Sequence, residues 1–377
     1  MKRIIILVGT RPEAIKMAPV IAALRSMKQY FTTRVCSSGQ HRELLASALA
    51  DFDVKPDIAL DVMTDGQTLA SLSARLFSAI DSMLETERPD AVLVQGDTTT
   101  VMVAALVAFY RGIAVGHVEA GLRSHNLHAP FPEELNRRIA TLATRWHFAP
   151  TSLSRDNLVK EGIEPRSIFI TGNPVIDALL TTVKKIERGK ASTNAALISL
   201  LSQPRKRVLV TAHRRENFGA PFLDICDAIA HLAKSHPDID FVYPVHPNPN
   251  VKATAHDRLG MIRTVHLLDP LPYTDFVHAL KSATLVLSDS GGLQEEAPAL
   301  GKPVLVMRDV TERPEGVDAG VNILVGSNKD KIISTVETLL NDEVAYRKIA
   351  QARNPFGDGT AGQKIAEILR DSWITKS

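Results

Sequence analysis

Short, almost continuously apolar runs alternate with longer amphipathic segments along the whole chain, and this alternation restricts the fold more than any other feature. Strands that are apolar on both faces are typical of a parallel sheet covered by helices on both sides. The predicted strands of the first half are 4–8, 91–95, 113–118 and 146–149, with helices at 17–27, 68–84 and 99–110. The pattern predicts an α/β protein with a doubly wound sheet.

A second series of the same kind begins near residue 207. Its predicted strands are 207–211, 239–245, 263–267, 284–288 and 303–307, and its helices are 221–234, 273–281 and 293–300. Two series in 377 residues predict two Rossmann-like domains that face each other across a cleft. We place the boundary after a strand at 168–171, which gives domains 1–172 and 173–377, and expect the polar stretch 184–204 to wrap the surface.

Composition excludes several classes of protein. The chain has 44 Lys and Arg against 42 Asp and Glu, a net charge of +2, which argues against a nucleic-acid-binding protein. The two cysteines, Cys36 and Cys226, lie far apart, so a reducing compartment is expected rather than a disulfide framework. The longest apolar run beyond the N-terminus, 101–110, is far below the roughly 18 residues of a membrane span. The sequence therefore predicts a cytoplasmic protein with no membrane partner.

Motifs for metals and dinucleotides give no site. The chain has no HExxH motif, no Cys–His cluster and no Walker A loop, so neither a metal nor a cofactor is predicted. A literal GxGxxG occurs at 357–362, but no second strand and ribose acid can follow it before the chain ends. We interpret it as a turn that opens the last helix.

Ligands of open α/β sheets bind beyond the carboxyl ends of the strands, and the loops there are polar in this chain. Arg11 and Lys16 follow the first strand near a predicted helix N-terminus, where anions are favoured. The alternative is a solvated first helical turn, but the place of the loop favours an anion site.

Three acidic residues follow later strands of the first series: Asp97, Glu119 and Glu133. Each has a purely structural alternative. The segment of Asp97 could cap a helix, Glu119 could pair with Arg123, and Glu133 could pair with Arg137 on a helix surface, as Glu134 could with Arg138. Three acids from separate loops at one edge of a sheet are, however, typical of an acid–base site.

The second series carries a predicted phosphate site. The strand at 284–288 runs into Asp289, Ser290, Gly291 and Gly292 and then into a helix, so bare backbone N–H groups would point at a bound anion. Asp289 or Ser290 could also cap that helix, and the alternative to a phosphate site is a Gly-rich turn with a charged helix behind it. Glu296, one turn into the helix, could accept hydrogen bonds from a ribose. Polar loops beginning at His213 and His246 follow two other strands.

Together these loops resemble the non-hydrolysing UDP-N-acetylglucosamine 2-epimerases of bacteria. The matching segments lie in order between residue 3 and about residue 360: 9–13, 96–100, 117–123, 213–216, 289–296 and 311–315. The resemblance implies two domains arranged as in two-domain nucleotide-sugar glycosyltransferases, with a last helix, about 361–373, that crosses back to the first domain. It also implies a homodimer that uses no metal and no nicotinamide, and a role in cell-surface polysaccharide biosynthesis.

The resemblance also implies roles for individual residues. Ser290, Gly291 and Gly292 are expected to bind the diphosphate, with Arg11 and His213 completing that pocket. Glu296 is expected to bind the ribose, and Phe276 and Leu271 are expected to lie near the uracil. Lys16 and Arg313 are expected to form a charged rim. Acid–base catalysis is expected from Asp97, Glu119 and Glu133, with His213 counted among the catalytic residues. Gln40 and His41 match part of a region where bacterial members bind a second, activating UDP-GlcNAc.

The implied reaction is the interconversion of UDP-GlcNAc and UDP-ManNAc through anti elimination of UDP and its re-addition. Alternatives are an epimerase of a related UDP-diacetamido sugar, a retaining nucleotide-sugar glycosyltransferase, or a non-catalytic nucleotide-sugar sensor. A glycosyltransferase has the same architecture but does not need three acids, and the acids also argue against a sensor.

Overall fold

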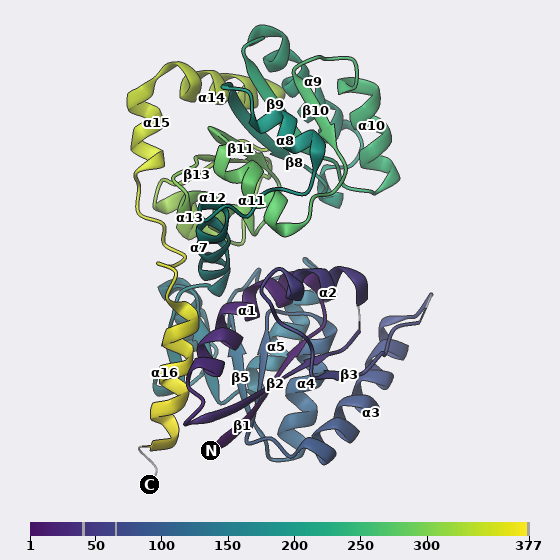
Figure 1. Ribbon diagram of the computed structural model, residues 1–377, viewed down its shortest axis with the longest axis vertical. Coiled ribbons are helices and arrows are strands. Elements are labelled where there is room, and N and C mark those ends of the chain that lie inside the picture. The colour runs from purple at the N-terminus through teal and green to yellow at the C-terminus, as the bar shows by residue number, and fades with distance from the viewer. Residues whose placement is uncertain (40–41, 65, 375–377) are drawn as a thin grey trace. The chain divides into compact units, whose positions relative to one another are not determined.

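The computed structural model describes residues 1–39, 42–64 and 66–374, and its contacts divide the chain into two compact units (Figure 1). Unit 1 comprises Met1–Ala178 and Phe356–Ser377, and unit 2 comprises Leu179–Pro355. The chain passes from unit 1 to unit 2 within helix α7 (Pro174–Glu187).

Unit 1 is built around a parallel sheet in the order β3-β2-β1-β4-β5-β6-β7. Its strands are β1 (Lys2–Val8), β2 (Phe31–Ser37), β3 (Ile58–Ala59), β4 (Ala91–Gln95), β5 (Ala114–Val118), β6 (Trp146–Ala149) and β7 (Ile168–Ile170). Its other helices are α1 (Arg11–Ser26), α2 (Arg42–Ala50), α3 (Leu69–Glu87), α4 (Thr99–Tyr110), α5 (Glu133–Ala143), α6 (Ser152–Lys160) and α16 (Ala361–Ile374).

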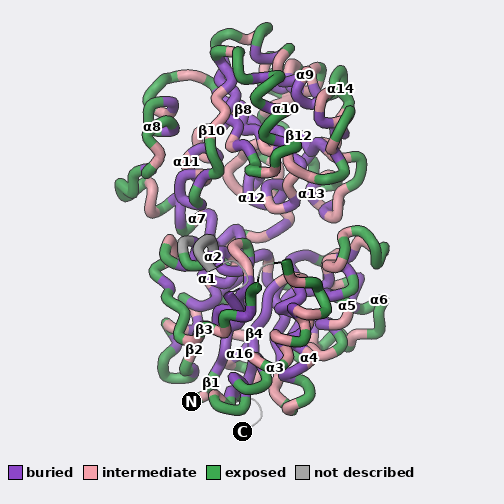
Figure 2. The backbone as a smooth tube through the Cα atoms, turned by 90° about the vertical axis from the view of Figure 1, so that its right-hand side faces the viewer, coloured by how far each residue is buried: buried purple, intermediate pink, exposed green. Residues whose placement is uncertain are grey.

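The central strands of unit 1 are buried on both faces, as Figure 2 shows for β1 and β4. Ile5 and Leu7 of β1 pack with α3 and α4 in one core cluster. The alternate residues Ile4 and Ile6 are equally buried and point to the opposite face. This double burial explains why the strands are almost continuously apolar in the sequence.

Unit 2 has a parallel sheet in the order β10-β9-β8-β11-β12-β13. Its strands are β8 (Lys206–Thr211), β9 (Ile239–Pro244), β10 (Val265–Leu268), β11 (Leu285–Ser288), β12 (Val304–Val306) and β13 (Asn322–Leu324). Its helices are α8 (Ala195–Leu201), α9 (Ala220–Ser235), α10 (Pro249–Leu259), α11 (Tyr273–Ser282), α12 (Leu293–Ala299), α13 (Pro314–Asp318), α14 (Lys329–Asn341) and α15 (Glu343–Ala350).

In both sheets the strand order reverses at the first strand of the unit. The sequence 3-2-1-4-5-6 is that of the doubly wound nucleotide-binding folds, so the predicted fold of two Rossmann-like units is confirmed. The reversal lies between β1 and β4 in unit 1 and between β8 and β11 in unit 2. Ligands of such sheets bind outside the carboxyl ends of the strands at this point.

The last helix, α16, packs against α1 of unit 1. A Cβ on Gly362 would come within 2.8 Å of the Pro19 carbonyl oxygen, so the two helices approach too closely for a larger residue. The Gly362 N–H donates to Asp177 Oδ1 at 2.8 Å. The ring of Trp373 meets Trp146 edge to face at 5.3 Å, which adds an aromatic contact at the other end of α16.

Several predicted elements were wrong in detail. The first helix begins at Arg11 rather than at residue 17, and β2 was not expected at all. The stretch 184–204 was predicted only to wrap the surface, but it contains the end of α7 and all of α8, whose Leu197 and Leu200 are buried. The turn predicted at 357–362 does open the last helix, since α16 begins at Ala361.

In the described ranges, no helix is both long and apolar enough to cross a membrane. In the same ranges, no group of three or more His, Cys, Asp or Glu residues is arranged to hold a metal ion.

Candidate active site

Glu119 is the most strongly held of the predicted acids. It follows β5 with a left-handed backbone, φ 63°, and its side chain is only 6% exposed. Lys16 Nζ donates to both carboxylate oxygens at 2.7 and 2.8 Å, Asn173 Nδ2 donates at 2.8 Å, and Gln95 also donates to the carboxylate. Several donors around one carboxylate stabilise its ionised form. The backbone turn aims the carboxylate at α1 rather than along the strand.

The alternative pairing of Glu119 with Arg123 is wrong. Arg123 forms a two-pronged ion pair with Glu161 of α6, at 2.9 and 2.8 Å. Its guanidinium is fully buried and also donates to Thr141 at 3.0 Å. Glu119 is therefore not paired with the nearest arginine in the sequence, and it forms an ion pair with Lys16.

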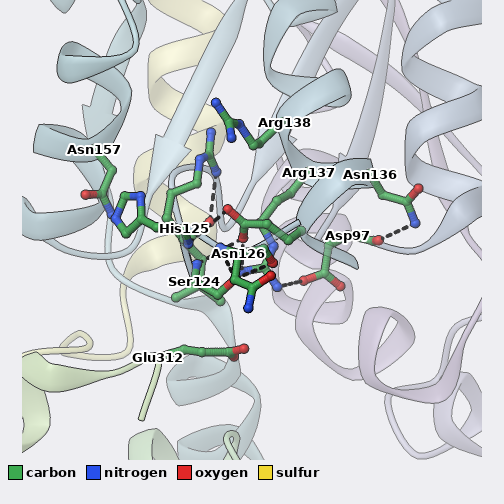
Figure 3. A network of polar contacts seen from close by, with 12 residues as sticks. Asp97, Ser124, His125, Asn126, Asn136, Arg137, Arg138, Asn157 and Glu312 are labelled. Carbon is green, nitrogen blue, oxygen red and sulfur yellow. Dashed lines mark hydrogen bonds and ion pairs between the residues drawn. The ribbon is translucent and has the colours of Figure 1, made fainter. Parts of the chain in front are cut away.

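Asp97 lies in the loop between β4 and α4, beside the strand-order reversal. Arg137 Nη2 of α5 donates to its carboxylate at 2.6 Å, and Asn136 donates to its backbone oxygen at 2.9 Å (Figure 3). Burial raises the pKa of Asp97, Arg137 opposes the rise, and the charges of Glu119 and Glu133 add to it. A carboxyl group with a raised pKa holds a proton more readily, as a general acid or base requires.

Glu133 begins α5 and is half-buried. The predicted surface pairs Glu133–Arg137 and Glu134–Arg138 do not form. Arg137 instead contacts Asp97 at 2.6 Å and Glu134 at 3.4 Å, and Arg138 faces Glu161 at 3.7 Å. The charge of Glu133 reaches Asp97, so unit 1 brings all three predicted acids into one electrostatic neighbourhood.

Glu134 has a structural role that the sequence did not reveal. It is completely buried, and its carboxylate accepts hydrogen bonds from the backbone N–H groups of Ser124 at 2.9 Å and His125 at 3.3 Å. It therefore fixes the loop after β5 to the start of α5, which carries Glu133.

His117 anchors the loop that carries Asp97. Burial lowers the pKa of His117 to about 4, so its imidazole is neutral at pH 7. Its Nε2 lies 2.7 Å from the carbonyl oxygen of Gly96, which can only accept, so Nε2 carries the ring proton. His117 therefore has a structural role in positioning this loop.

Glu13 is a buried acid that sequence reasoning passed over as part of a first helical turn. Its Oε2 accepts the Gly9 N–H at 2.6 Å, and Thr10 and Thr98 side chains also bond to it. It thus joins the loop of Arg11 to the loop of Asp97. Burial raises the pKa of Glu13 to about 7.

We expect Glu13 to make the protein less stable as pH rises. Its pKa is about 7 when folded against an ordinary 4.5, so the folded state binds the proton more tightly between these values. The unfolding free energy should therefore fall as pH rises through this window, by on the order of 2 kcal/mol between pH 5 and 8. Urea unfolding at both pH values should show this component in the parent protein and lack it in Glu13→Gln. Equal pH dependence in the two proteins would contradict it.

Arg11 opens α1 and is half-buried, so it stands where an anion site was predicted. Lys16, predicted for a charged rim, contacts Glu119 in this structure. Gln40 and His41 lie outside the described residues.

In unit 2 the predicted phosphate loop joins β11 to α12. Ser290 N–H donates to Ser288 Oγ at 2.9 Å, and Gly292 occupies the N-cap position without a side-chain cap. Neither Asp289 nor Ser290 caps α12, because that place belongs to Gly292. A Cβ on Gly291 would lie 2.6 Å from Arg313 Nη1, so the bare backbone of Gly291 admits the guanidinium.

Arg313 is held in place by a buried partner. Its Nε donates to Glu295 of α12, and both side chains are less than a tenth exposed. Burial of this pair keeps the guanidinium beside Gly291, and its Nη1 also lies 3.5 Å from Glu312 Oε2. The predicted role of Arg313 on a charged rim stays a prediction.

The residues predicted for the nucleoside lie on neighbouring elements of unit 2. Glu296 accepts a hydrogen bond from the Tyr273 hydroxyl at 3.0 Å. Phe276 is half-buried on α11, and Leu271 is buried in the loop before it.

His213 follows β8, and Asp289 follows β11, directly beside the strand-order reversal of unit 2. His213 Nδ1 lies 3.4 Å from Asp289 Oδ1. The His213 ring stacks on His246 with centroids 5.2 Å apart and planes 11° apart. Burial lowers the pKa of His213, and Asp289 opposes the shift.

Comparison with known proteins gives one consistent family. The sequence profile of the UDP-N-acetylglucosamine 2-epimerases matches residues 23–370. The UDP-N-acetylglucosamine 2-epimerases of Escherichia coli K12 and Yersinia pestis are each 47% identical over 375 residues, covering 99% of this chain and all of the relative. A solved structure of the Neisseria meningitidis UDP-GlcNAc 2-epimerase, bound to UDP-GlcNAc, is 44% identical with a TM-score of 0.90, covering 98% of this chain and 100% of its own.

Proposed function

This chain belongs to the UDP-N-acetylglucosamine 2-epimerase family and is therefore an isomerase, and we propose that it interconverts UDP-GlcNAc and UDP-ManNAc. The observation that carries the proposal is the cluster of Asp97, Glu119 and Glu133 at the carboxyl edge of the unit 1 sheet. An epimerisation needs proton transfer on both faces of one carbon, and carboxylates supply it.

The chemistry explains why a nucleotide must leave. The proton on C2 of the sugar is not next to a carbonyl carbon, so its direct removal would be very slow. In an anti elimination, the C2–H and C1–O bonds break, the C1–C2 double bond forms, and the products are 2-acetamidoglucal, UDP and a proton held by the enzyme. UDP then re-adds to C1 while a proton is delivered to the opposite face of C2. No oxidant or metal is needed to balance these steps.

We assign the proton transfers to unit 1. Asp97, whose pKa is raised, can hold a proton, while Glu119 is surrounded by donors that favour its ionised form. Glu133 is the third member of the cluster. Because the three carboxylates have different surroundings, we assign one of them as general acid, one as general base and one as a group that orients the sugar.

We assign the binding of UDP to unit 2. Gly291, Gly292 and the side chain of Arg313 offer backbone and guanidinium donors for the diphosphate. His213 stands beside the same loops, and Glu296 and Phe276 suit the ribose and the uracil. Arg11 and Lys16 of unit 1 are proposed to contact the same ligand.

A homodimer, a cytoplasmic location and a role in cell-surface polysaccharide biosynthesis remain predictions. The exposed apolar side chains of Phe109, Tyr110 and Leu142, on the packed helices α4 and α5, support a homodimer. The two free, buried cysteines support a reducing compartment.

Deuterium incorporation tests the function directly. Incubated with UDP-GlcNAc alone in deuterated water, the protein should form UDP-ManNAc and place deuterium at C2 of both sugars, because the C2 proton exchanges at the carboxylates. A retaining glycosyltransferase or a sensor would leave C2 unlabelled without an acceptor. If UDP-GlcNAc stayed unlabelled and a UDP-diacetamido sugar became labelled at C2, the substrate would be that related sugar.

A further inference from the structure

Asp289 is a completely buried carboxylate to which the reaction above gives no role. Its Oδ2 accepts the backbone N–H groups of His213 and Arg214, both at 2.8 Å, and the side-chain amide of Asn217 at 3.2 Å. Three donors on one oxygen join the loop after β8 to the loop after β11.

The second oxygen, Oδ1, is buried and accepts no hydrogen bond from the described residues. It lies 3.4 Å from His213 Nδ1. A buried carboxylate oxygen without a donor is costly, and a proton on the neighbouring Nδ1 of His213 lowers that cost. The neutral tautomer expected beside Asp289 therefore carries its proton on Nδ1 and leaves Nε2 with a lone pair.

His246 does not compete for this proton. Its Nδ1 accepts the Asn248 backbone N–H at 3.1 Å and so carries no proton itself. Its ring stacks on His213 and limits the rotation of that ring. The imidazole is thus fixed by a carboxylate at one edge and by a second ring on its face.

We propose that Asp289 is a positioning residue that keeps the His213 proton on Nδ1 and presents Nε2 to the diphosphate of the substrate. The proposal rests on the proposed function. The reactive form is the imidazolium: as the C1–O bond breaks, Nε2–H gives its proton to the leaving phosphate oxygen, and the neutral ring keeps its Nδ1–H on Asp289. When that oxygen re-adds to C1, the proton returns to Nε2.

The charged and titratable groups around His213 agree with this role. Asp289 favours the imidazolium, whereas Arg214 and His246 oppose it, and burial lowers the pKa of the ring. Of these groups, Asp289 is the one that favours the imidazolium. The arrangement parallels the aspartate–histidine pair of serine proteases, where the aspartate sets the tautomer.

Asp289→Asn tests the proposal. The amide can keep its oxygen toward the backbone N–H groups and turn its NH2 toward His213 Nδ1, which would force the ring proton onto Nε2. We expect turnover to fall by about a hundred- to ten-thousand-fold; the same change in a serine protease lowers kcat by about ten-thousand-fold. KM for UDP-GlcNAc and the Kd of UDP should change less than about tenfold.

The matched control is Asp240→Asn. Asp240 is also buried in unit 2 and also faces an imidazole, His266 Nε2, at 3.2 Å, but it lies at the start of β9. This variant should lose stability without changing the pH profile of turnover.

Nitrogen-15 NMR of histidine gives a readout that does not depend on activity, with His213→Gln used to assign the signal. The parent protein should show a neutral His213 protonated on Nδ1, and Asp289→Asn should show the Nε2–H tautomer and a lower pKa. An Nε2–H tautomer in the parent protein overturns the proposal even if the variant does not fold. So does a loss of turnover with an unchanged tautomer, or full turnover in His213→Gln. Failure of the parent protein to label C2 would instead reject the proposed function and leave the tautomer result standing.

Discussion

Asp97→Asn, Glu119→Gln and Glu133→Gln should each reduce epimerisation by about a hundred- to ten-thousand-fold, the usual effect of removing a general acid or base. The three residues lie in unit 1, whereas the UDP-binding loops are assigned to unit 2, so the Kd of UDP should change far less. Glu119→Gln should also place an amide NH2 among the donors Lys16, Gln95 and Asn173. A variant that still expels UDP would release 2-acetamidoglucal.

Turnover, melting temperature and C2 deuterium exchange should be measured on the same proteins. Glu161→Gln is the matched control, because Glu161 is a carboxylate of unit 1 paired with Arg123 outside the cluster. If the three acids only capped helices or paired with arginines, each variant would lose about 1 kcal/mol of stability and keep its turnover. Normal deuterium exchange in all three would reject the catalytic assignment.

Gly291→Leu should weaken UDP binding by about a hundredfold or more. The new Cβ would lie 2.6 Å from Arg313 Nη1, and Arg313 cannot easily move because Glu295 holds its Nε in a buried pair. The side chain would also cover the backbone that is proposed to face the diphosphate. Ser290→Leu should act in the same direction.

Calorimetric titration with UDP measures both variants, and a thermal melt establishes that they fold. Ala319→Leu, at an exposed position after α13, adds similar bulk to unit 2 away from the loop and should bind UDP normally. Unchanged affinity in Gly291→Leu would remove this loop from the binding site.

The sequence predicted strands best where both faces are buried. β1 and β4 are mostly apolar, β8 has an apolar centre, and all three were found within a residue or two. β2 was missed because Thr32, Thr33 and Arg34 separate the buried Phe31 from the three buried residues at the end of the strand. A strand interrupted by polar residues in this way has no continuous apolar run to reveal it.

The position of the acids could be predicted, but their partners could not. Asp97 and Glu119 each lie in a loop that follows a buried strand. Because the carboxyl ends of parallel strands lie at one edge of a sheet, where ligands bind, both residues could be predicted as site residues. The Lys16–Glu119 contact joins residues 103 apart in the sequence. The short spacing in sequence favoured Arg123 as the partner of Glu119, but in the folded protein Arg123 forms its ion pair with Glu161. Which side chains pair in the folded protein depends on tertiary packing, and the spacing of residues along the sequence does not show that packing.

Buried polar residues at ordinary-looking positions were the hardest to find. Glu13 resembles any acid in a first helical turn, and Asp289 resembles a helix cap. Both are instead buried carboxylates that join two loops of one sheet. Only their zero or near-zero exposure distinguishes them, and exposure at a loop follows from the tertiary fold.

The return of α16 to α1 has a consequence for synthesis. Unit 2 is one continuous segment, Leu179–Pro355, inserted between the two parts of unit 1, so α16 is synthesised after the whole of unit 2. Buried apolar residues of α16, such as Ile365 and Leu369, can pack against unit 1 only at that point. Unit 2 can therefore begin to fold before unit 1 is complete, and until α16 is made one face of α1 stays open to chaperones.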